Sequence, residues 1–465
     1  MEGKPALEPL FISPPRGALM TFVLFLCGNG EAIRRLAATP RLWLVGLLLT
    51  FSAGLAREYD AEDLLAEPWH LLIAPGASWA AATALWLLVQ VSGVGRWVWS
   101  PTKPQTSSTP PDMESGLESP PANPPQAPRL RDNYLAFLGL FWLTAPLAWF
   151  YGIPFERFQS AGQAASSNLW LLTLIALWRV VLMVRVLQVL YGVGGVVASI
   201  IVLLFGNALM LAALVTMPVP IFAIMGGVHL GEADQALAFL VLAGKVVGTI
   251  ALVILGLLWL STFLGRKRWS WNVASAPVPL TPLAVVAAVA IAWWCAWLPV
   301  TQPEQRLRGQ VERALLSGDF ATGLSVLSRN PPEAFPPHWD PPPRVGYTGD
   351  AKPDPGDVLL YMLDHQHLLE HSQSGRCQRL FEDKLIAQGW IYMLSLRKNR
   401  AALSNLVTLL ERMPDAGRLM HPEFPPHEHD RELYGLYRVL SGVGVSNDAD
   451  LNQRIGALLE RYPLR

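Results

Sequence analysis

The sequence predicts an all-α protein, in which a polytopic transmembrane helical bundle of about seven spans is followed by a soluble all-α domain. Of the 465 residues, 52% are hydrophobic and only 15% are charged, whereas an ordinary soluble protein has about 25% charged residues. Residues 1–300 hold 17 Lys or Arg and 15 Asp or Glu, and the shorter remainder holds 19 and 21. The charge deficit therefore lies in the first part, and a net charge of zero predicts no nucleic-acid partner.

Residues 1–40 are expected to form a cytoplasmic N-terminus that carries one short apolar segment. The run "ALMTFVLFLC", residues 18–27, is shorter than the roughly 20 residues that a membrane-spanning helix needs. No small-residue cleavage pattern follows it, so it does not have the form of a signal peptide. We expect an interfacial or re-entrant segment. If it spans the membrane instead, the number of spans rises by one.

Seven apolar stretches have about the length that crossing a bilayer requires. In chain order they cover residues 41–56, 69–92, 134–153, 169–191, 193–217, 236–264 and 280–300. The first is short, and a start nearer Leu36 would lengthen it. Residues 41–100 thus hold the first two spans and an acidic outside loop, and residues 134–300 hold the other five.

Residues 101–133 separate the second and third spans. Most of this stretch is "PTKPQTSSTPPDMESGLESPPANPPQAP", which is rich in Pro and Ser and nearly free of large apolar side chains. Such a composition cannot bury a core, so we predict a disordered cytoplasmic linker.

The distribution of Lys and Arg predicts the orientation, because short cytoplasmic loops are enriched in both. With the N-terminus inside, the inside segments hold Lys4, Arg16, Arg34, Arg35, Arg41, Arg96, Lys103, Arg129, Arg131, Arg266, Lys267 and Arg268. The short outside loops hold only Arg57 and Arg157. Seven spans then place residues 301–465 outside the cytoplasm of a cell-membrane protein.

The first outside loop contains the stretch "LAREYDAEDLLAEPWH", residues 55–70. Its candidate binding residues are Glu58, Asp60, Glu62 and Asp63. Glu58, Glu62 and Asp63 approach helical spacing, and their oxygen atoms could hold a cation. The alternative is a solvated connection between two helices. Because the loop lies on the same side as the C-terminal domain, docking of that domain is a further hypothesis.

Arg179, in "LWRVVLMVRVLQVL", lies near the middle of the fourth span. A charge at membrane depth is a functional hypothesis by default, with a structural or snorkelling role as the alternative. No Asp or Glu lies in a predicted span to pair with it, which counts against a coupled transporter. The fifth segment is broken at Pro218 and Pro220 yet stays apolar to Met225, which is compatible with a cavity-lining segment or an interfacial turn.

Residues 301–465 are predicted to form an extracytoplasmic helical domain. The stretch "PEQRLRGQVERALLSGDFATGLSVLSRNPP" predicts two short helices around "SGDF", and a Pro-rich irregular stretch and several short helices follow. One motif has a chemical form: "HQHLLEH" contains His367, Glu370 and His371 in the order H-x-x-E-H. The two imidazoles could bind zinc and Glu370 could polarise a water. The alternative is an exposed, locally His-rich helix face.

Two phrases, "AREYDAEDLLAEPWHLL" and "FPPHWDPPPRVGY", resemble segments of uncharacterised multi-pass bacterial membrane proteins. Those proteins share the layout of an apolar part followed by a soluble part. The resemblance implies a bacterial inner-membrane location and this layout, and no activity.

The leading functional hypothesis is a membrane-anchored interaction or scaffold protein, which acts through its extracytoplasmic helical domain on a protein partner. One alternative is a transport or channel component that uses Arg179 and the broken fifth segment. A second alternative is a zinc-dependent hydrolase that uses His367, Glu370 and His371. An enzyme is the less favoured class, because no G-x-S-x-G, Walker A, CxxC or kinase signature occurs.

Overall fold

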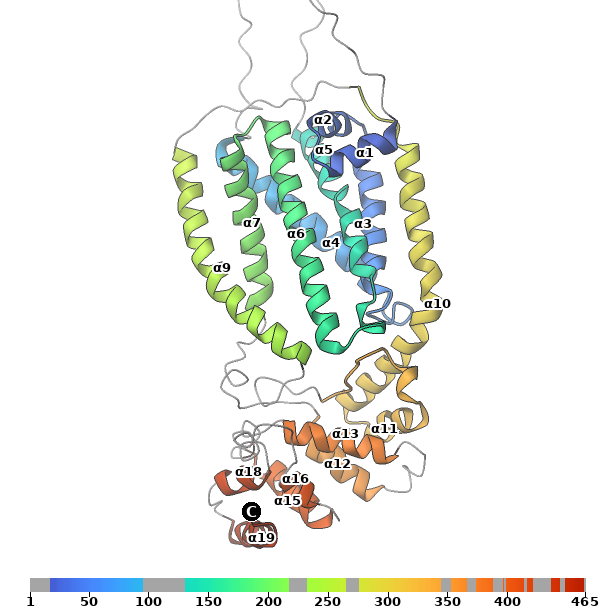
Figure 1. Cartoon of the computed structure of the whole chain (residues 1–465), viewed down its shortest axis with the longest axis vertical. Coiled ribbons are helices and arrows are strands. Elements are labelled where there is room, and N and C mark those ends of the chain that lie inside the picture. The colour runs from blue at the N-terminus through green and yellow to red at the C-terminus, as the bar shows by residue number, and fades with distance from the viewer. Residues whose placement is uncertain are drawn as a thin grey trace, which may run out of the picture.

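A computed structural model shows a helical protein (Figure 1). It describes residues 17–94, 130–216, 232–264, 276–343, 353–365, 374–387, 396, 399–413, 416–420, 436–443 and 448–463. Within these ranges the chain forms helices and connections and contains no strand. The predicted all-α class is therefore confirmed. The predicted linker 101–133 lies almost entirely outside the described residues.

The first part of the chain forms a bundle of long helices. Its elements are α1 (Ala18–Leu26), α2 (Gly30–Ala37), α3 (Leu42–Glu58), α4 (His70–Val89), η1 (Gln90–Val94), α5 (Leu130–Trp142), η3 (Ala145–Gly152), η4 (Phe155–Arg157), α6 (Ala161–Tyr191), α7 (Gly195–Val215), α9 (Glu232–Leu264) and α10 (Thr281–Ser317). Among the described residues, six helical segments are long and apolar enough to cross a membrane. They match the second to the seventh predicted spans.

The first predicted span, residues 41–56, corresponds to α3. With 17 residues, this helix qualifies as a span only together with α2, from which it is bent by 109°. The predicted total of seven thus depends on whether this bent pair crosses. Helix α1 has nine residues, so its length is about 14 Å, half of the roughly 30 Å hydrocarbon core. Helices α1 and α2 lie together at one end of the bundle (Figure 1).

Local sequence signals account for the ends and contacts of the long helices. Ser160 and Gln163 form a capping box at the start of α6, and Gly192 ends that helix with a φ of +64°. Helices α3 and α5 approach closely at Gly46, where a Cβ would lie 2.8 Å from Cβ of Trp142. Small residues permit such backbone approach between membrane helices.

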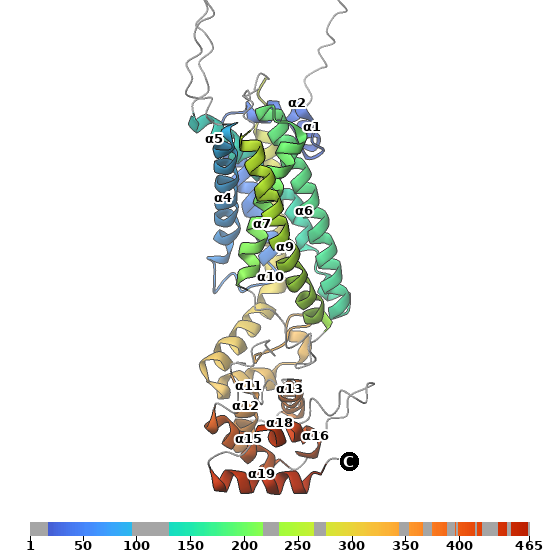
Figure 2. The same ribbon diagram turned by 90° about the vertical axis from the view of Figure 1, so that its left-hand side faces the viewer.

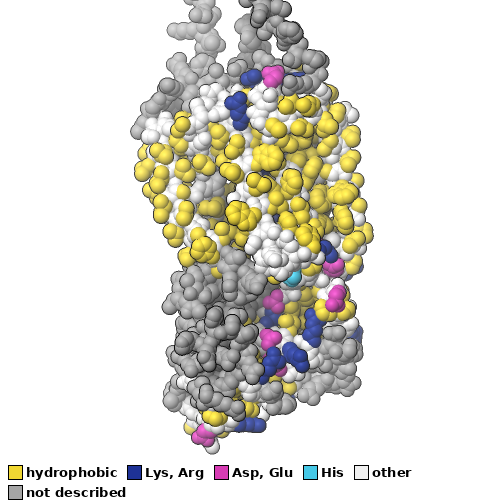
Figure 3. Space-filling model, viewed as in Figure 1, with side chains coloured by type: hydrophobic (Ala, Val, Ile, Leu, Met, Phe, Trp, Pro, Cys, Tyr) yellow, Lys and Arg dark blue, Asp and Glu magenta, His cyan; other side chains and the backbone are white. Residues whose placement is uncertain are grey.

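The outer surface of the bundle is apolar. Of the six candidate spans, Leu130–Arg157 is the most enclosed, with 61% of its apolar window buried, and the others have only 17 to 22% buried. Figure 3 shows hydrophobic side chains over one face of the bundle, with charged side chains gathered toward its two ends. Apolar area of this extent marks a protein or membrane contact surface, and its position on helices of spanning length indicates a membrane protein.

Helix α10 differs from the prediction. The predicted seventh span ends at Val300, and two short helices were expected after it, but α10 continues to Ser317 through Pro299 and Pro303. Only the second of these helices, α11 (Phe320–Arg329), is separate. Two prolines and the onset of charge are ordinary signs of a helix end. Side chains of this stretch contact another part of the chain, as described below.

The C-terminal helical part consists of short helices beyond α10. They are α11, η5 (Pro332–Ala334), α12 (Pro355–Asp364), α13 (Ser374–Ala387), α15 (Arg400–Arg412), α16 (Ala416–Met420), α18 (Leu436–Val443) and α19 (Ala449–Arg461). Their buried side chains form one hydrophobic cluster, and those of the bundle form another. Both views place this part at the end of the bundle opposite α1 and α2 (Figures 1 and 2).

Candidate functional site

The acidic loop, residues 59–69, connects α3 to α4 and contacts α10 through its backbone. Four consecutive loop carbonyls accept hydrogen bonds from α10 side chains. The bonds are Thr301 Oγ1 to Tyr59 O (2.5 Å), Gln302 Nε2 to Tyr59 O and Glu62 O (3.1 Å each), Gln305 Nε2 to Asp60 O (2.7 Å) and Arg308 Nη1 to Ala61 O (2.5 Å). The donors are spaced at helical intervals and therefore share one face of α10. The loop thus docks the segment that continues into the C-terminal helical part.

An ion-pair bridge reinforces this contact. Arg157, at the end of η4, lies 2.7 Å from Asp60 and 2.9 Å from Glu304 of α10. The guanidinium is bonded to both carboxylates through more than one nitrogen, a geometry in which charge-assisted hydrogen bonds are strongest. The predicted binding residue Asp60 therefore belongs to a structural bridge between three elements.

Tyr59 anchors the start of the acidic loop. Its hydroxyl donates to the carbonyl of Gly152 at 2.9 Å, and its ring lies 5.3 Å from that of Trp294. Burial, together with the nearby Asp60 carboxylate, raises the pKa of Tyr59 to about 12. The hydroxyl therefore stays protonated at neutral pH and acts as a donor.

Three other loop-region side chains face one another. One ligand atom from each of Glu58, Glu62 and His70 lies within 4.8 Å of the others, and all three residues are half-buried. The sequence singled out the two glutamates but not His70, which begins α4. His70 lies eight positions after Glu62, and because the chain between them is not one helix, the sequence spacing does not predict that the two side chains are close. This mixed oxygen and nitrogen set could hold a metal ion.

Asp63 takes no part in this group. Its side chain is buried, and Oδ1 accepts a hydrogen bond from the amide of Ala66 at 3.2 Å. Among the described residues Oδ2 has no hydrogen-bond partner. The four predicted binding residues of the loop thus separate into three different environments.

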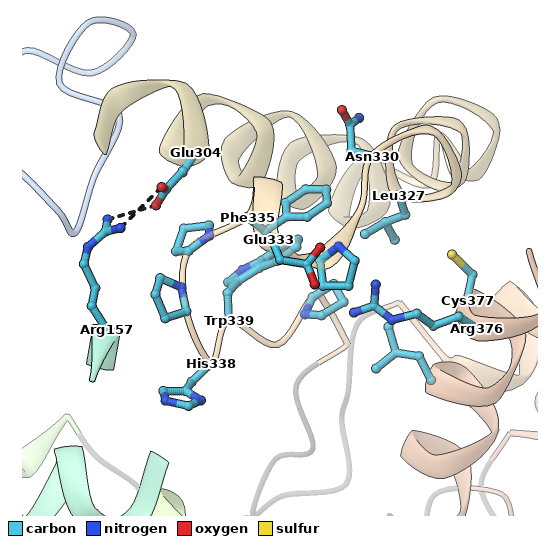
Figure 4. Close-up of a pocket in the computed structure, with 15 residues that line it drawn as sticks. Arg157, Glu304, Leu327, Asn330, Glu333, Phe335, His338, Trp339, Arg376 and Cys377 are labelled. Atoms are coloured by element: carbon cyan, nitrogen blue, oxygen red, sulfur yellow. Dashed lines mark hydrogen bonds and ion pairs between the residues drawn. The ribbon is translucent and has the colours of Figure 1, made fainter. Parts of the chain in front are cut away.

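A pocket of about 550 Å³ lies where the C-terminal helical part meets the bundle. Its residues come from η4, α10, α11, the Pro-rich loop and α13: Arg157, Glu304, Leu327, Asn330, Pro332, Glu333, Phe335, Pro336, Pro337, His338, Trp339, Pro341, Arg376, Cys377 and Leu380. Figure 4 shows the rings of Phe335 and Trp339 between the Arg157–Glu304 pair and Arg376. The pocket wall is therefore mainly apolar and ends in charged groups.

Side-chain contacts fix the Pro-rich loop that lines this pocket. Phe335 stacks on Trp339 with ring centroids 5.0 Å apart, and Trp339 Nε1 donates to Glu312 at 2.9 Å. His338 Nε2 lies 2.8 Å from the carbonyl of Gln159, next to the bundle. Burial raises the pKa of the Cys377 thiol, so this pocket residue stays protonated and is a poor nucleophile at neutral pH.

Arg179 lies on α6 beside the bundle interior. Its guanidinium carbon is 5.6 Å from the centroid of the Phe141 ring on α5, which is within the range of a cation–π contact. The residue is half-buried. This contact gives Arg179 a structural partner on a neighbouring helix.

Several predicted features fall outside the described residues. They are His367, Glu370 and His371 of the zinc motif and the proline-broken end of the fifth segment. No family model, curated protein or solved structure matches the chain.

Proposed function

We propose that the chain is a multi-pass membrane protein that binds a protein partner through its C-terminal helical part, outside the cytoplasm. The pocket between this part and the bundle carries the proposal. Pockets that bind ligands are mostly apolar, largely pre-formed and contain a few placed polar groups. Here Phe335 and Trp339 supply the apolar wall, and Glu333 and Arg376 supply charge of both signs.

The contacts around the pocket support a pre-formed site. The acidic loop and Arg157 hold α10, and Trp339 is bonded to the same helix. A site whose walls are fixed before binding loses less conformational entropy when the partner arrives. Aromatic anchors in such pockets commonly carry most of the energy of a protein interface.

The orientation rests on the Lys and Arg distribution. Among the described residues, Arg34, Arg35, Arg41 and Arg131 lie on α2, at the start of α3 and at the start of α5, away from the C-terminal helical part (Figure 1). Arg57 and Arg157 lie at the other end. By the positive-inside rule, the end with α1 and α2 is cytoplasmic. A tag after Arg465 is expected to be accessible from outside the cytoplasm in intact cells, and protection of that tag would contradict this orientation.

The binding proposal is tested by site-specific photo-cross-linking of the full chain in its native membrane. A cross-linking side chain at Glu333, in the pocket, is expected to give one discrete protein adduct. The same side chain at Glu460, exposed on α19, serves as the matched control and is expected to give none. The variant Leu380→Trp fills the pocket and is expected to abolish the Glu333 adduct while the protein still inserts.

An identical adduct from both positions would contradict the proposal. So would an adduct from position 333 that survives Leu380→Trp in protein with unchanged expression and thermal unfolding, because the pocket would then be irrelevant to the contact.

A further inference from the structure

We propose that Glu58, Glu62 and His70 bind one divalent metal ion of the zinc class and that this ion ties the end of α3 to the start of α4. The site is separate from the pocket and from the His-rich stretch of the C-terminal part. It offers two carboxylates and one imidazole, which are all groups that bind zinc, and open zinc sites have three protein ligands and a water in the fourth position.

The distances suit a zinc ion after a small adjustment. The three ligand atoms lie within 4.8 Å of one another. Bonds of about 2.0 to 2.2 Å place tetrahedral zinc ligands roughly 3.3 to 3.6 Å apart. Closing the remaining distance would require the two glutamate side chains to rotate; Glu62 is half-buried and the Glu58 side chain is 13% exposed.

The imidazole of His70 already has the partner that metal-binding histidines use. Its Nε2 lies 3.1 Å from a carboxylate oxygen of Glu67. A hydrogen bond from one ring nitrogen to a carboxylate fixes the tautomer and leaves the other nitrogen free to bind a metal. In the proposed site Nε2 would carry the proton and donate to Glu67, and Nδ1 would bind the metal.

The charge balance of the loop gives an independent argument for a cation. Among the described residues, the Glu62 carboxylate has no hydrogen-bond or ion-pair partner. Gln302, whose Nε2 donates to the Glu62 carbonyl at 3.1 Å, has a buried Oε1 that finds no donor among the described residues. Buried acceptors without partners are rare in native proteins, and an ion or water is a usual explanation.

The neighbouring arginines do not fill this deficit. Arg157 is shared by Asp60 and Glu304, and Arg313 lies 3.6 Å from Glu67. Arg57 lies 3.6 Å from Glu58, but its side chain is 72% exposed and extends into solvent. A divalent cation among Glu58, Glu62 and His70 would compensate the Glu62 carboxylate and add to the exposed Arg57 contact of Glu58.

The test measures metal binding by the full-length protein in detergent micelles, after a chelator has removed bound metal. Zn²⁺ is then titrated and quantified by elemental analysis, and Co²⁺ is used as a probe because its visible absorption reports tetrahedral ligation. The wild-type chain is expected to bind one equivalent with that spectrum and to unfold at a higher temperature when Zn²⁺ is present. Glu62→Gln and His70→Gln are expected to weaken binding at least about tenfold.

Two further variants make the result specific. Glu31→Gln changes an exposed carboxylate on α2 and is expected to leave binding and the Co²⁺ spectrum unchanged. His367→Gln removes a histidine of the other candidate zinc motif and is expected to leave this site intact. Binding that is lost in His367→Gln and kept in His70→Gln would overturn the proposal. So would a wild-type chain that takes up no stoichiometric metal.

Discussion

The hydrogen bonds between α10 and the acidic loop predict that replacing the buried Gln305 loosens the loop more than replacing the buried Gln302 does. Gln305 donates to Asp60 O at 2.7 Å, and this carbonyl has no other donor among the described residues. Gln302 donates to Tyr59 O and to Glu62 O. Each of these carbonyls accepts a second hydrogen bond, Tyr59 O from the Thr301 hydroxyl and Glu62 O from the Leu64 amide. Replacing Gln305 therefore leaves the part-buried Asp60 carbonyl without a donor among the described residues, whereas replacing Gln302 leaves each of its two acceptors with another donor.

Methionine is the appropriate replacement, because it keeps the length of the side chain and removes its polar atoms. An acceptor left without a partner costs about 1 to 3 kcal/mol when it is buried. Because the Asp60 carbonyl is part-buried, we expect the lower end for Gln305→Met, about 1 kcal/mol or about a fivefold increase in opening of the loop. Gln302→Met also removes an Oε1 atom that lacks a donor. Its expected cost is below about 1 kcal/mol, a change in opening of less than about fivefold.

Hydrogen exchange of the loop amides, measured by mass spectrometry in detergent micelles, reports this opening. The informative amides are those bonded inside the loop, such as Glu62 N to Glu58 O and Glu67 N to Asp63 O. Gln310→Met, at an exposed position of the same helix, controls for the substitution itself. The reasoning is refuted if Gln302→Met loosens the loop as much as Gln305→Met, or if Gln305→Met matches the control.

Three further predictions concern other contacts. Gly152→Ala is expected to destabilise the bundle, because the added Cβ would lie 2.4 Å from an indole ring; Gly256→Ala, which meets nothing within 4 Å, is the control, and equal thermal unfolding of the two would contradict the packing. Arg157→Gln is expected to cost about 1 kcal/mol, since the partly exposed guanidinium joins two carboxylates; a double-mutant cycle that finds no coupling would count against the bridge. Hydrogen bonding to Arg454 lowers the pKa of Glu411, so its stabilisation is complete above the ordinary carboxyl pKa of about 4.3 and is lost as the pH falls through the lowered value. Thermal unfolding measured from pH 3 to 6 checks this sign, and Glu411→Gln should flatten part of the profile.

The spans could be predicted because apolar length is a local property of the sequence. The stretches 69–92 and 193–217 correspond to the helical segments His70–Ser92 and Gly195–Val215 with small differences at their ends. Continuation of α10 through Pro299 and Pro303 could not be predicted in this way. The side chains of this stretch bind loop carbonyls that lie more than 200 positions away in the sequence.

The charged residues in the sequence predict where the candidate site lies, but not which contacts its residues make. The carboxylates of the acidic loop predict a binding site, yet the loop contacts α10 mainly through backbone carbonyls, which every residue has. Asp60 binds Arg157, which lies 97 positions away in the sequence. His70 lies near Glu58 and Glu62 only because the loop folds back. Likewise, the composition of the Pro-rich stretch near Trp339 predicts irregular backbone. It does not predict the pocket, because the pocket is lined by residues from several separate elements.

Helix α10 also has a mechanical consequence, because one continuous helix belongs to both the bundle and the C-terminal helical part. The helix extends roughly 24 Å from Thr301, which is hydrogen-bonded to the acidic loop, to Ser317. A tilt of about 10° at Thr301 would displace its far end by about 4 Å over that length. The contact between the acidic loop and α10 thus lies at the position from which a small tilt of the spans would be passed along the helix to the C-terminal helical part.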